Sequence, residues 1–179
     1  MGLFQKFRRE TLKRQSAPPE GQPDTPASLP EITAPLAGAV VPMKEIPDPV
    51  FAEGVLGVCV GIEPGEGTLQ LCAPMTGTVT QCSDTGHAVG ITAPDGKTAV
   101  LLHAGIDTVE MAGAGFALHV QEGDSVAAGQ AVLTMNTDKV RLAGHPCTVV
   151  VVVTETEIPV QPAAEVALRT GETLFTAAE

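Results

Sequence analysis

Two histidines, His87 and His103, stand in short apolar stretches that a turn-like segment separates. That segment, 94–96 (PDG), suits a three-residue hairpin loop, because proline fixes φ and glycine accepts a left-handed conformation. Counting back from such a loop pairs Val89 with Leu101 and His87 with His103. Directly opposed residues of an antiparallel pair share one face, with Cβ atoms roughly 4.5–5.5 Å apart. We therefore expect the two imidazoles to lie side by side on one sheet surface.

Paired imidazoles allow three kinds of chemistry, and the residue pattern leaves all three open. The pair could hold a metal ion, although no third ligand is obvious nearby and Cys82 is weakly placed. It could act as an acid–base pair, although no nucleophilic serine or cysteine stands beside it. One ring could also accept a group covalently while the other stabilises that group. Thr85 shares the strand parity of His87, so its hydroxyl could orient an imidazole.

Glycine and proline interrupt the apolar runs of the chain, with 19 Gly and 15 Pro in 179 residues, which favours many short strands. Segments 34–40 and 73–79 both have the pattern A-P-x-x-G-x-V and predict a sheet of two related halves. One short helix is expected at 137–143, with Gly144 as its C-cap. Strands are expected at 55–62, 68–72, 117–120, 131–135, 148–154 and 172–176. We predict an all-β fold, an antiparallel β-sandwich or barrel-like domain with one or two short helices.

Charge divides the chain into a basic tail and an acidic body. Residues 1–16 contain five of the ten basic residues but only one of the 21 acidic residues. We expect 1–15 to be a disordered tail or an amphipathic helix on an anionic membrane surface. A proline-rich linker, 16–30, and a folded domain, 31–179, should follow. The acidic body argues against a nucleic-acid partner and for a basic protein partner.

The four cysteines show no Cys-x-x-Cys spacing, which favours free thiols in a reducing compartment. No apolar run approaches the ~20 residues of a membrane span. A cytoplasmic protein is therefore expected.

A second segment allows a different function. Residues 123–129 (GDSVAAG), followed by Lys139, are similar to the lipoyl-domain pattern, in which a lysine at a hairpin tip carries lipoic acid. On this alternative the protein is a swinging-arm carrier modified at Lys139. The expected helix after Lys139 disfavours it, because the chain should return there as a strand, and the histidine pair would stay unexplained.

Several motifs, taken together, resemble a known family. They are 34–38 (APLAG), 47–53 (PDPVFAE), 73–77 (APMTG), 85–88 (TGHA), 103–110 (HAGIDTVE) and 122–129 (EGDSVAAG). Residues from about 32 to 175 resemble the glucose-type enzyme IIA component, the EIIA-Glc family, of the bacterial phosphoenolpyruvate-dependent sugar phosphotransferase system (PTS).

The resemblance implies a role for each residue of the site. His103 would accept a phosphoryl group from the phosphohistidine of the carrier protein HPr. It would then pass the group to a cysteine of a sugar-specific IIB domain of a membrane permease. His87 would donate an N–H to the phosphoryl oxygens, while Thr85 and nearby backbone carbonyls would fix the tautomers of the rings.

The resemblance also implies a docking surface around the histidines, with an acidic rim of Asp48 and Asp107. Its apolar residues would be Val50, Phe51, Val55, Leu56, Val89 and Leu101. Phosphoryl transfer would need no cofactor. An alternative within the family is a non-catalytic regulatory binding protein, in which His87 and His103 share a zinc ion with a partner's carboxylate.

Overall fold

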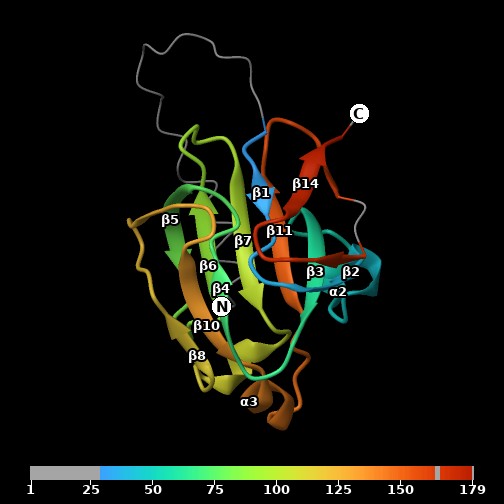
Figure 1. The fold of residues 1–179 in the computed structure, drawn as a ribbon, viewed down its shortest axis with the longest axis vertical. Coiled ribbons are helices and arrows are strands. Elements are labelled where there is room, and N and C mark those ends of the chain that lie inside the picture. The colour runs from blue at the N-terminus through green and yellow to red at the C-terminus, as the bar shows by residue number, and fades with distance from the viewer. Residues whose placement is uncertain (1–28, 164–165, 179) are drawn as a thin grey trace.

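A computed structural model describes residues 29–163 and 166–178. The predicted tail 1–15 and nearly all of the predicted linker 16–30 lie outside these residues. The described chain forms three antiparallel sheets, the largest with eight strands (Figure 1). The order of strands in that sheet is β13 (Ala167–Leu168), β2 (Gly38–Val41), β3 (Val58–Pro64), β11 (Val149–Glu155), β7 (Ala99–Ala104), β6 (Ala88–Thr92), β5 (Gly77–Cys82) and β9 (Ser125–Val126).

Two three-stranded sheets complete the fold. One contains β1 (Ile32–Thr33), β14 (Thr173–Ala177) and β12 (Val160–Pro162), and the other β4 (Thr68–Cys72), β10 (Ala131–Asn136) and β8 (Phe116–Leu118). Helical segments are short: η1 (Met43–Glu45), α2 (Pro49–Ala52), η2 (Thr108–Met111) and α3 (Thr137–Leu142). The predicted all-β fold is confirmed. Within the described ranges, no helix has the length and apolar character that crossing a membrane requires.

The helix predicted at 137–143 is confirmed as α3. Its N-cap is Asn136, whose side-chain oxygen accepts a hydrogen bond from the backbone N–H of Lys139 at 2.9 Å. After the helix, Gly144 takes the left-handed conformation with φ +88°. Figure 1 shows α3 at the end of the molecule toward which β7 runs.

The central strands β11, β7 and β6 of the eight-stranded sheet are buried on both faces. Alternate residues of β7 and β11 enter two separate apolar clusters: Leu102 and Val151 join the main core, while Leu101 and Val150 join a second cluster. The main core lies between this sheet and the two small sheets. The second cluster lies on the opposite face, where it includes Phe51 of α2. Burial on both faces explains why β11 is an unbroken run of valines at 149–153.

The two A-P-x-x-G-x-V segments occupy equivalent places, as the predicted relation between the halves requires. Gly38 begins β2 and Gly77 begins β5, each strand lying second from an edge of the eight-stranded sheet. A Cβ atom added to Gly38 would collide with the carbonyl oxygen of Glu63, and one added to Gly77 with that of Thr92. The glycine of each segment therefore permits close packing against the next strand.

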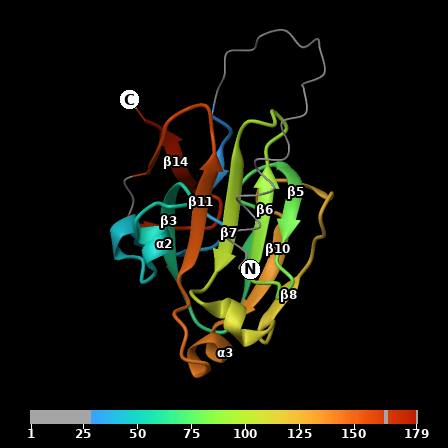
Figure 2. The same cartoon turned by 180° about the vertical axis from the view of Figure 1, so that it is seen from behind.

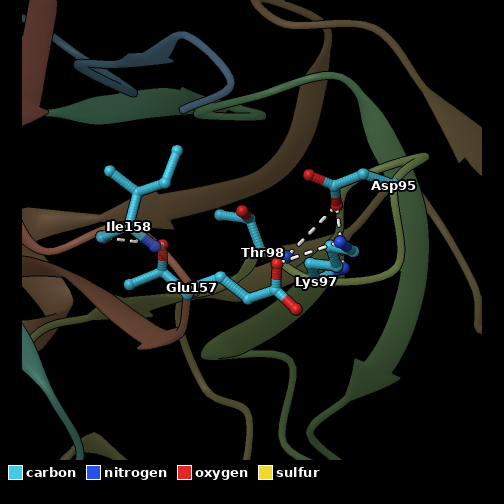
Figure 3. A network of polar contacts seen from close by, with 6 residues as sticks. Asp95, Lys97, Thr98, Glu157 and Ile158 are labelled. Carbon is cyan, nitrogen blue, oxygen red and sulfur yellow. Dashed lines mark hydrogen bonds and ion pairs between the residues drawn. The ribbon is translucent and has the colours of Figure 1, made fainter. Parts of the chain in front are cut away.

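The hairpin between β6 and β7 differs from the prediction by one residue. Its loop has four residues, 94–97, closed by a hydrogen bond from the N–H of Ala93 to the oxygen of Thr98 at 2.8 Å. The cause is visible in Figure 3: a carboxylate oxygen of Asp95 accepts hydrogen bonds from the backbone N–H groups of Lys97 and Thr98, at 2.8 and 3.2 Å. These bonds stabilise the longer loop, so the three-residue loop was wrong.

The longer loop shifts the register of the hairpin. His103 pairs with Ala88, and Val89 pairs with Leu102. Val89 and Leu101 are therefore not opposite each other, and they face different sides of the sheet. An ion pair of 2.9 Å between Lys97 and Glu157 joins this hairpin tip to the segment after β11 (Figure 3).

Candidate functional site

The two imidazole rings lie side by side, as predicted. Their centroids are 4.9 Å apart and their planes meet at 76°. The two rings are close although the predicted strand register was wrong, because His87 lies just before β6, outside the regular strand. The chain turns there at Gly86, with φ +71°, and the carbonyl of His87 still accepts a hydrogen bond from the N–H of Ala104 at 2.8 Å. A break in strand geometry, not direct pairing, brings the rings together.

A backbone carbonyl fixes the protonation pattern of His103. Nδ1 of this ring lies 2.8 Å from the carbonyl oxygen of Gly105. Because a carbonyl only accepts, Nδ1 carries the proton of the neutral ring and Nε2 carries the lone pair. Burial lowers the pKa of His103 to about 4, and the bond to Gly105 opposes that shift. At neutral pH the ring is therefore uncharged, with a basic Nε2.

A threonine hydroxyl holds the second ring. Oγ1 of Thr85 lies 2.6 Å from Nδ1 of His87, so the predicted contact is confirmed. Thr85 lies in the turn before β6 and not, as its parity suggested, in the strand. Burial, and in second place the nearby His103, lower the pKa of His87 to about 4. When the hydroxyl donates to Nδ1, Nε2 of His87 carries an N–H that can donate.

Helix α2, which the sequence analysis missed, packs against His103. Phe51 contacts His103 edge to face, with ring centroids 5.2 Å apart. The helix starts at Asp48, whose carboxylate accepts hydrogen bonds from the N–H groups of Val50 and Phe51 at 2.7 and 3.1 Å. An N-cap aspartate followed by proline at the first helical position is a known start signal, so the sequence did contain the information.

The predicted docking residues divide by exposure. Val89 and Leu101 are both 0% exposed, so their prediction as docking residues was wrong, and Phe51 is also buried. Val55 is 63% exposed, while Val50, Leu56 and Asp48 are partly buried and Asp107 is exposed. The sequence analysis missed Val109, which is 52% exposed and follows two residues after Asp107.

Two further predictions concern metal and lipoic acid. Within the described residues, no group of three or more His, Cys, Asp and Glu side chains could hold a metal ion. The histidine pair supplies two nitrogen ligands, so a tetrahedral zinc ion would need ligands from outside those residues. Lys139 lies inside α3 and not at a hairpin tip, so the lipoyl alternative was wrong.

Comparisons with known proteins identify the family of this chain. A model of the phosphoenolpyruvate-dependent sugar phosphotransferase system EIIA 1 family matches residues 30–158. The PTS glucose-specific EIIA component of Bacillus cereus is 40% identical over 126 residues, 70% of this chain and 74% of that protein. The PTS beta-glucoside-specific EIIBCA component of Bacillus subtilis is 38% identical over 126 residues, 70% of this chain and 20% of that protein.

The fold matches as well. The solved structure of glucose permease IIA from Mycoplasma capricolum superposes with a TM-score of 0.76 at 26% identity, covering 86% of this chain and 98% of that one. The family model covers most of the chain. The chain therefore belongs to the EIIA 1 family of the phosphoenolpyruvate-dependent sugar phosphotransferase system.

Proposed function

We propose that the protein is a cytoplasmic phosphoryl carrier. His103 accepts a phosphoryl group from the phosphohistidine of HPr and passes it to a cysteine of a sugar-specific IIB domain. The observation that carries this proposal is the pair of neutral, buried imidazoles with ring centroids 4.9 Å apart, one of which presents a basic nitrogen. Acceptance on nitrogen uses that lone pair directly, without a separate base.

In the acceptance step, Nε2 of His103 attacks phosphorus. A new P–N bond forms there while the P–N bond to the imidazole of HPr breaks, and the electron pair of the broken bond stays with that leaving ring. The proton on Nδ1 of His103 remains in place, so the phosphorylated ring gains positive character. The carbonyl of Gly105, 2.8 Å from Nδ1, stabilises that charge. Little covalent work is left to the protein, so positioning and charge stabilisation dominate.

His87 is the group that stabilises the phosphoryl oxygens. With Thr85 donating to Nδ1, Nε2–H of His87 points a donor at the transferred group beside His103. A neutral donor suits this role, because it strengthens as negative charge gathers on the oxygens yet does not compete for the lone pair of His103. The low pKa of His87 supports the neutral form at the pH of the cytoplasm.

The surface near the site fits a basic partner with an apolar contact area. Val55 and Val109 expose apolar side chains, and Asp107 is an exposed carboxylate in the loop that follows His103. The acidic body of the chain adds long-range attraction for such a partner. The name of the relative from Bacillus subtilis, an EIIBCA component, supports a IIB domain as the acceptor.

The test is phosphorylation with purified components. Incubation with phosphoenolpyruvate, enzyme I and HPr should place one acid-labile phosphate on His103, located by mass spectrometry under alkaline conditions. His103→Gln should take up none. His119→Gln is the matched control, because His119 is an exposed histidine bonded to Thr134 at 2.7 Å and lies outside the pair. It should be phosphorylated like the wild type.

The outcomes separate this proposal from the regulatory alternative. A wild-type protein that stays unphosphorylated would overturn the carrier function. A zinc ion bound between His87, His103 and a partner's carboxylate would then become the better proposal. Equilibrium dialysis with zinc, with and without the partner, would test it.

A further inference from the structure

The loop after β7 holds the carbonyl that sets the tautomer of His103. Gly105 has φ +75° and Asp107 has φ 56°, so two residues of this loop take the left-handed conformation, which is uncommon for a residue other than glycine. A Cβ atom on Gly105 would meet the methyl carbon Cγ2 of Thr108 at 2.5 Å and the oxygen of Pro146 at 3.1 Å. The Gly105 backbone is therefore enclosed by Thr108 on one side and by the chain before β11 on the other.

Thr108 joins the end of this loop to its start. The side chain is 0% exposed, and its hydroxyl donates a hydrogen bond to the carbonyl oxygen of Ala104 at 2.7 Å. Ala104 directly precedes Gly105, whose own carbonyl lies 2.8 Å from Nδ1 of His103. A second bond, from the N–H of Ile106 to the oxygen of Pro146 at 3.0 Å, fixes the middle of the loop.

We propose that Thr108 is a positioning residue that holds His103 in the tautomer with the proton on Nδ1. Its hydroxyl anchors the peptide before Gly105, and its methyl group fills the space beside the Gly105 backbone. Together they aim the Gly105 carbonyl at the ring.

Such control is needed because the intrinsic preference of histidine runs the other way. A neutral imidazole side chain in water favours the proton on Nε2, which would leave no lone pair on the nitrogen that attacks. The site therefore has to reverse the preference through one correctly placed acceptor. The wrong tautomer of an active-site histidine lowers catalysis strongly in enzymes that depend on it. Thr108 acts on His103 through the Gly105 carbonyl.

Ring-nitrogen NMR tests the proposal without relying on the proposed function. In ¹⁵N-histidine-labelled protein, the His103 signals, assigned by their loss in His103→Gln, should show a protonated Nδ1 and an unprotonated Nε2. Thr108→Val keeps the shape and the methyl group but loses the hydroxyl, so the ring should become a mixture of tautomers. Thr108→Ser restores the hydroxyl and should return most of the wild-type pattern.

Thr137→Val is the matched control. Thr137 is also 0% exposed and donates to a backbone carbonyl, that of Gly67 at 3.1 Å, but it lies at α3 outside the histidine pair. It should leave the His103 signals unchanged despite losing a comparable buried hydrogen bond. If Thr108→Val does not fold, Thr108→Cys, with a weaker donor of similar size, should give a smaller shift in the same direction.

A folded Thr108→Val or Thr108→Cys protein with the wild-type tautomer would overturn the proposal. The consequence for transfer rests on the proposed function. Acceptance by Thr108→Val should slow in proportion to the loss of the Nδ1-protonated tautomer seen by NMR, about a few fold, with an unchanged KM for HPr, because the residue is buried and acts on the ring alone. Failure of the wild type to accept phosphate would contradict the proposed function while the NMR result still decides the role of Thr108.

Discussion

The two halves of the eight-stranded sheet share one strand pattern, yet only one half carries histidines. Val151 pairs with Leu102 at the centre of the sheet, and the pairing is repeated on either side of this point. In the first half β3 pairs Ile62 with Val149, and in the second half β6 pairs Ile91 with Val100. Both strands have the sequence Val-Gly-Ile, at 60–62 and 89–91.

The two halves differ at the positions that His87 and His103 occupy. His103 of β7 pairs with Ala88 of β6. The equivalent pair in the other half is Val152 of β11 with Cys59 of β3. The place of His87 corresponds to Val58, but β3 continues through Val58 while β6 begins only at Ala88. The strand framework is therefore common to both halves. The site differs by histidines at two of these positions and by a strand, β6, that begins one residue later than β3 does.

The half formed by β3 and β11, which has Val58 and Val152 at the histidine positions and is called the valine half, also contacts the site. Cys59 of β3 lies 3.3 Å, measured from Sγ, from the carbonyl oxygen of Phe51, whose ring contacts His103. Burial raises the pKa of Cys59 to about 11, so this thiol stays protonated and can donate. One half of the sheet therefore carries the reacting groups, and the other holds the helix that packs against them.

The largest effect on phosphoryl transfer should follow from giving the site the residues of the valine half. His103→Val should abolish phosphoryl acceptance, because the nucleophilic nitrogen is gone, while the fold survives since Val152 is fully buried at the equivalent place. His87→Gln should still accept the group but pass it on roughly 10- to 100-fold more slowly, since an amide keeps only part of the stabilisation. Transfer of radioactive phosphate measures both. The assigned roles would be reversed if His103→Val accepted the phosphoryl group, or if His87→Gln did not accept it while His103→Val did.

The two histidines should make stability depend on pH in the acidic range. Both rings have a pKa of about 4 in the folded state against 6.5 ordinarily, so the unfolded chain binds more protons between these values. The free energy of unfolding should fall as pH drops from 6.5 toward 4, by at most about 3 kcal/mol for each ring. Urea unfolding at several pH values measures it. The double variant His87→Gln/His103→Gln should have a flatter profile, and an unchanged slope would contradict the assignment.

Sequence alone predicted the framework better than the site. The apolar runs located β4 (Thr68–Cys72) with its observed bounds and β10 and β14 within a residue, because burial of alternating or continuous apolar side chains is a local signal. The repeated A-P-x-x-G-x-V pattern correctly indicated two halves. Helix α3 was predicted with Gly144 as its stop signal, and Gly144 is left-handed there.

The prediction errors had two causes: a side chain that hydrogen-bonds to the backbone, and the burial of residues that were predicted to be exposed. Asp95 lengthened the hairpin loop by binding two N–H groups, and this choice between loop types shifted the whole register. The family resemblance placed Val89 and Leu101 in a docking surface, whereas both side chains are fully buried. Whether a sheet is covered on one face or on both depends on segments distant in sequence, such as α2, so exposure could not be predicted locally.

Removing the hydrogen bond between the Cys59 thiol and the Phe51 carbonyl should have a smaller effect on stability and on phosphoryl acceptance. Cys59→Ala gives β3 the residue that β6 has at Ala88 and removes the donor to Phe51. We expect about 0.5–1 kcal/mol of lost stability and acceptance slowed no more than a few fold, since a thiol is a weak donor. Cys147→Ala is the control, because its thiol bonds the carbonyl of Thr137 at 3.5 Å near α3. Equal slowing in the two variants would contradict a specific link through Phe51.

The smallest effect on acceptance should come from deleting residues 1–16. If the histidine half holds all the groups that react, acceptance from HPr should be unchanged without this segment. Its five basic residues contribute on the order of 1 kcal/mol each near an anionic membrane, while the acidic body is repelled from it. Deletion should therefore slow only transfer to a membrane-embedded IIB partner, measured with vesicles that contain the permease. Circular dichroism should show added helix on anionic vesicles for the full chain but not for the deletion. Identical spectra with and without vesicles, together with unchanged transfer, would contradict membrane binding by residues 1–16 while leaving the comparison of the two halves intact.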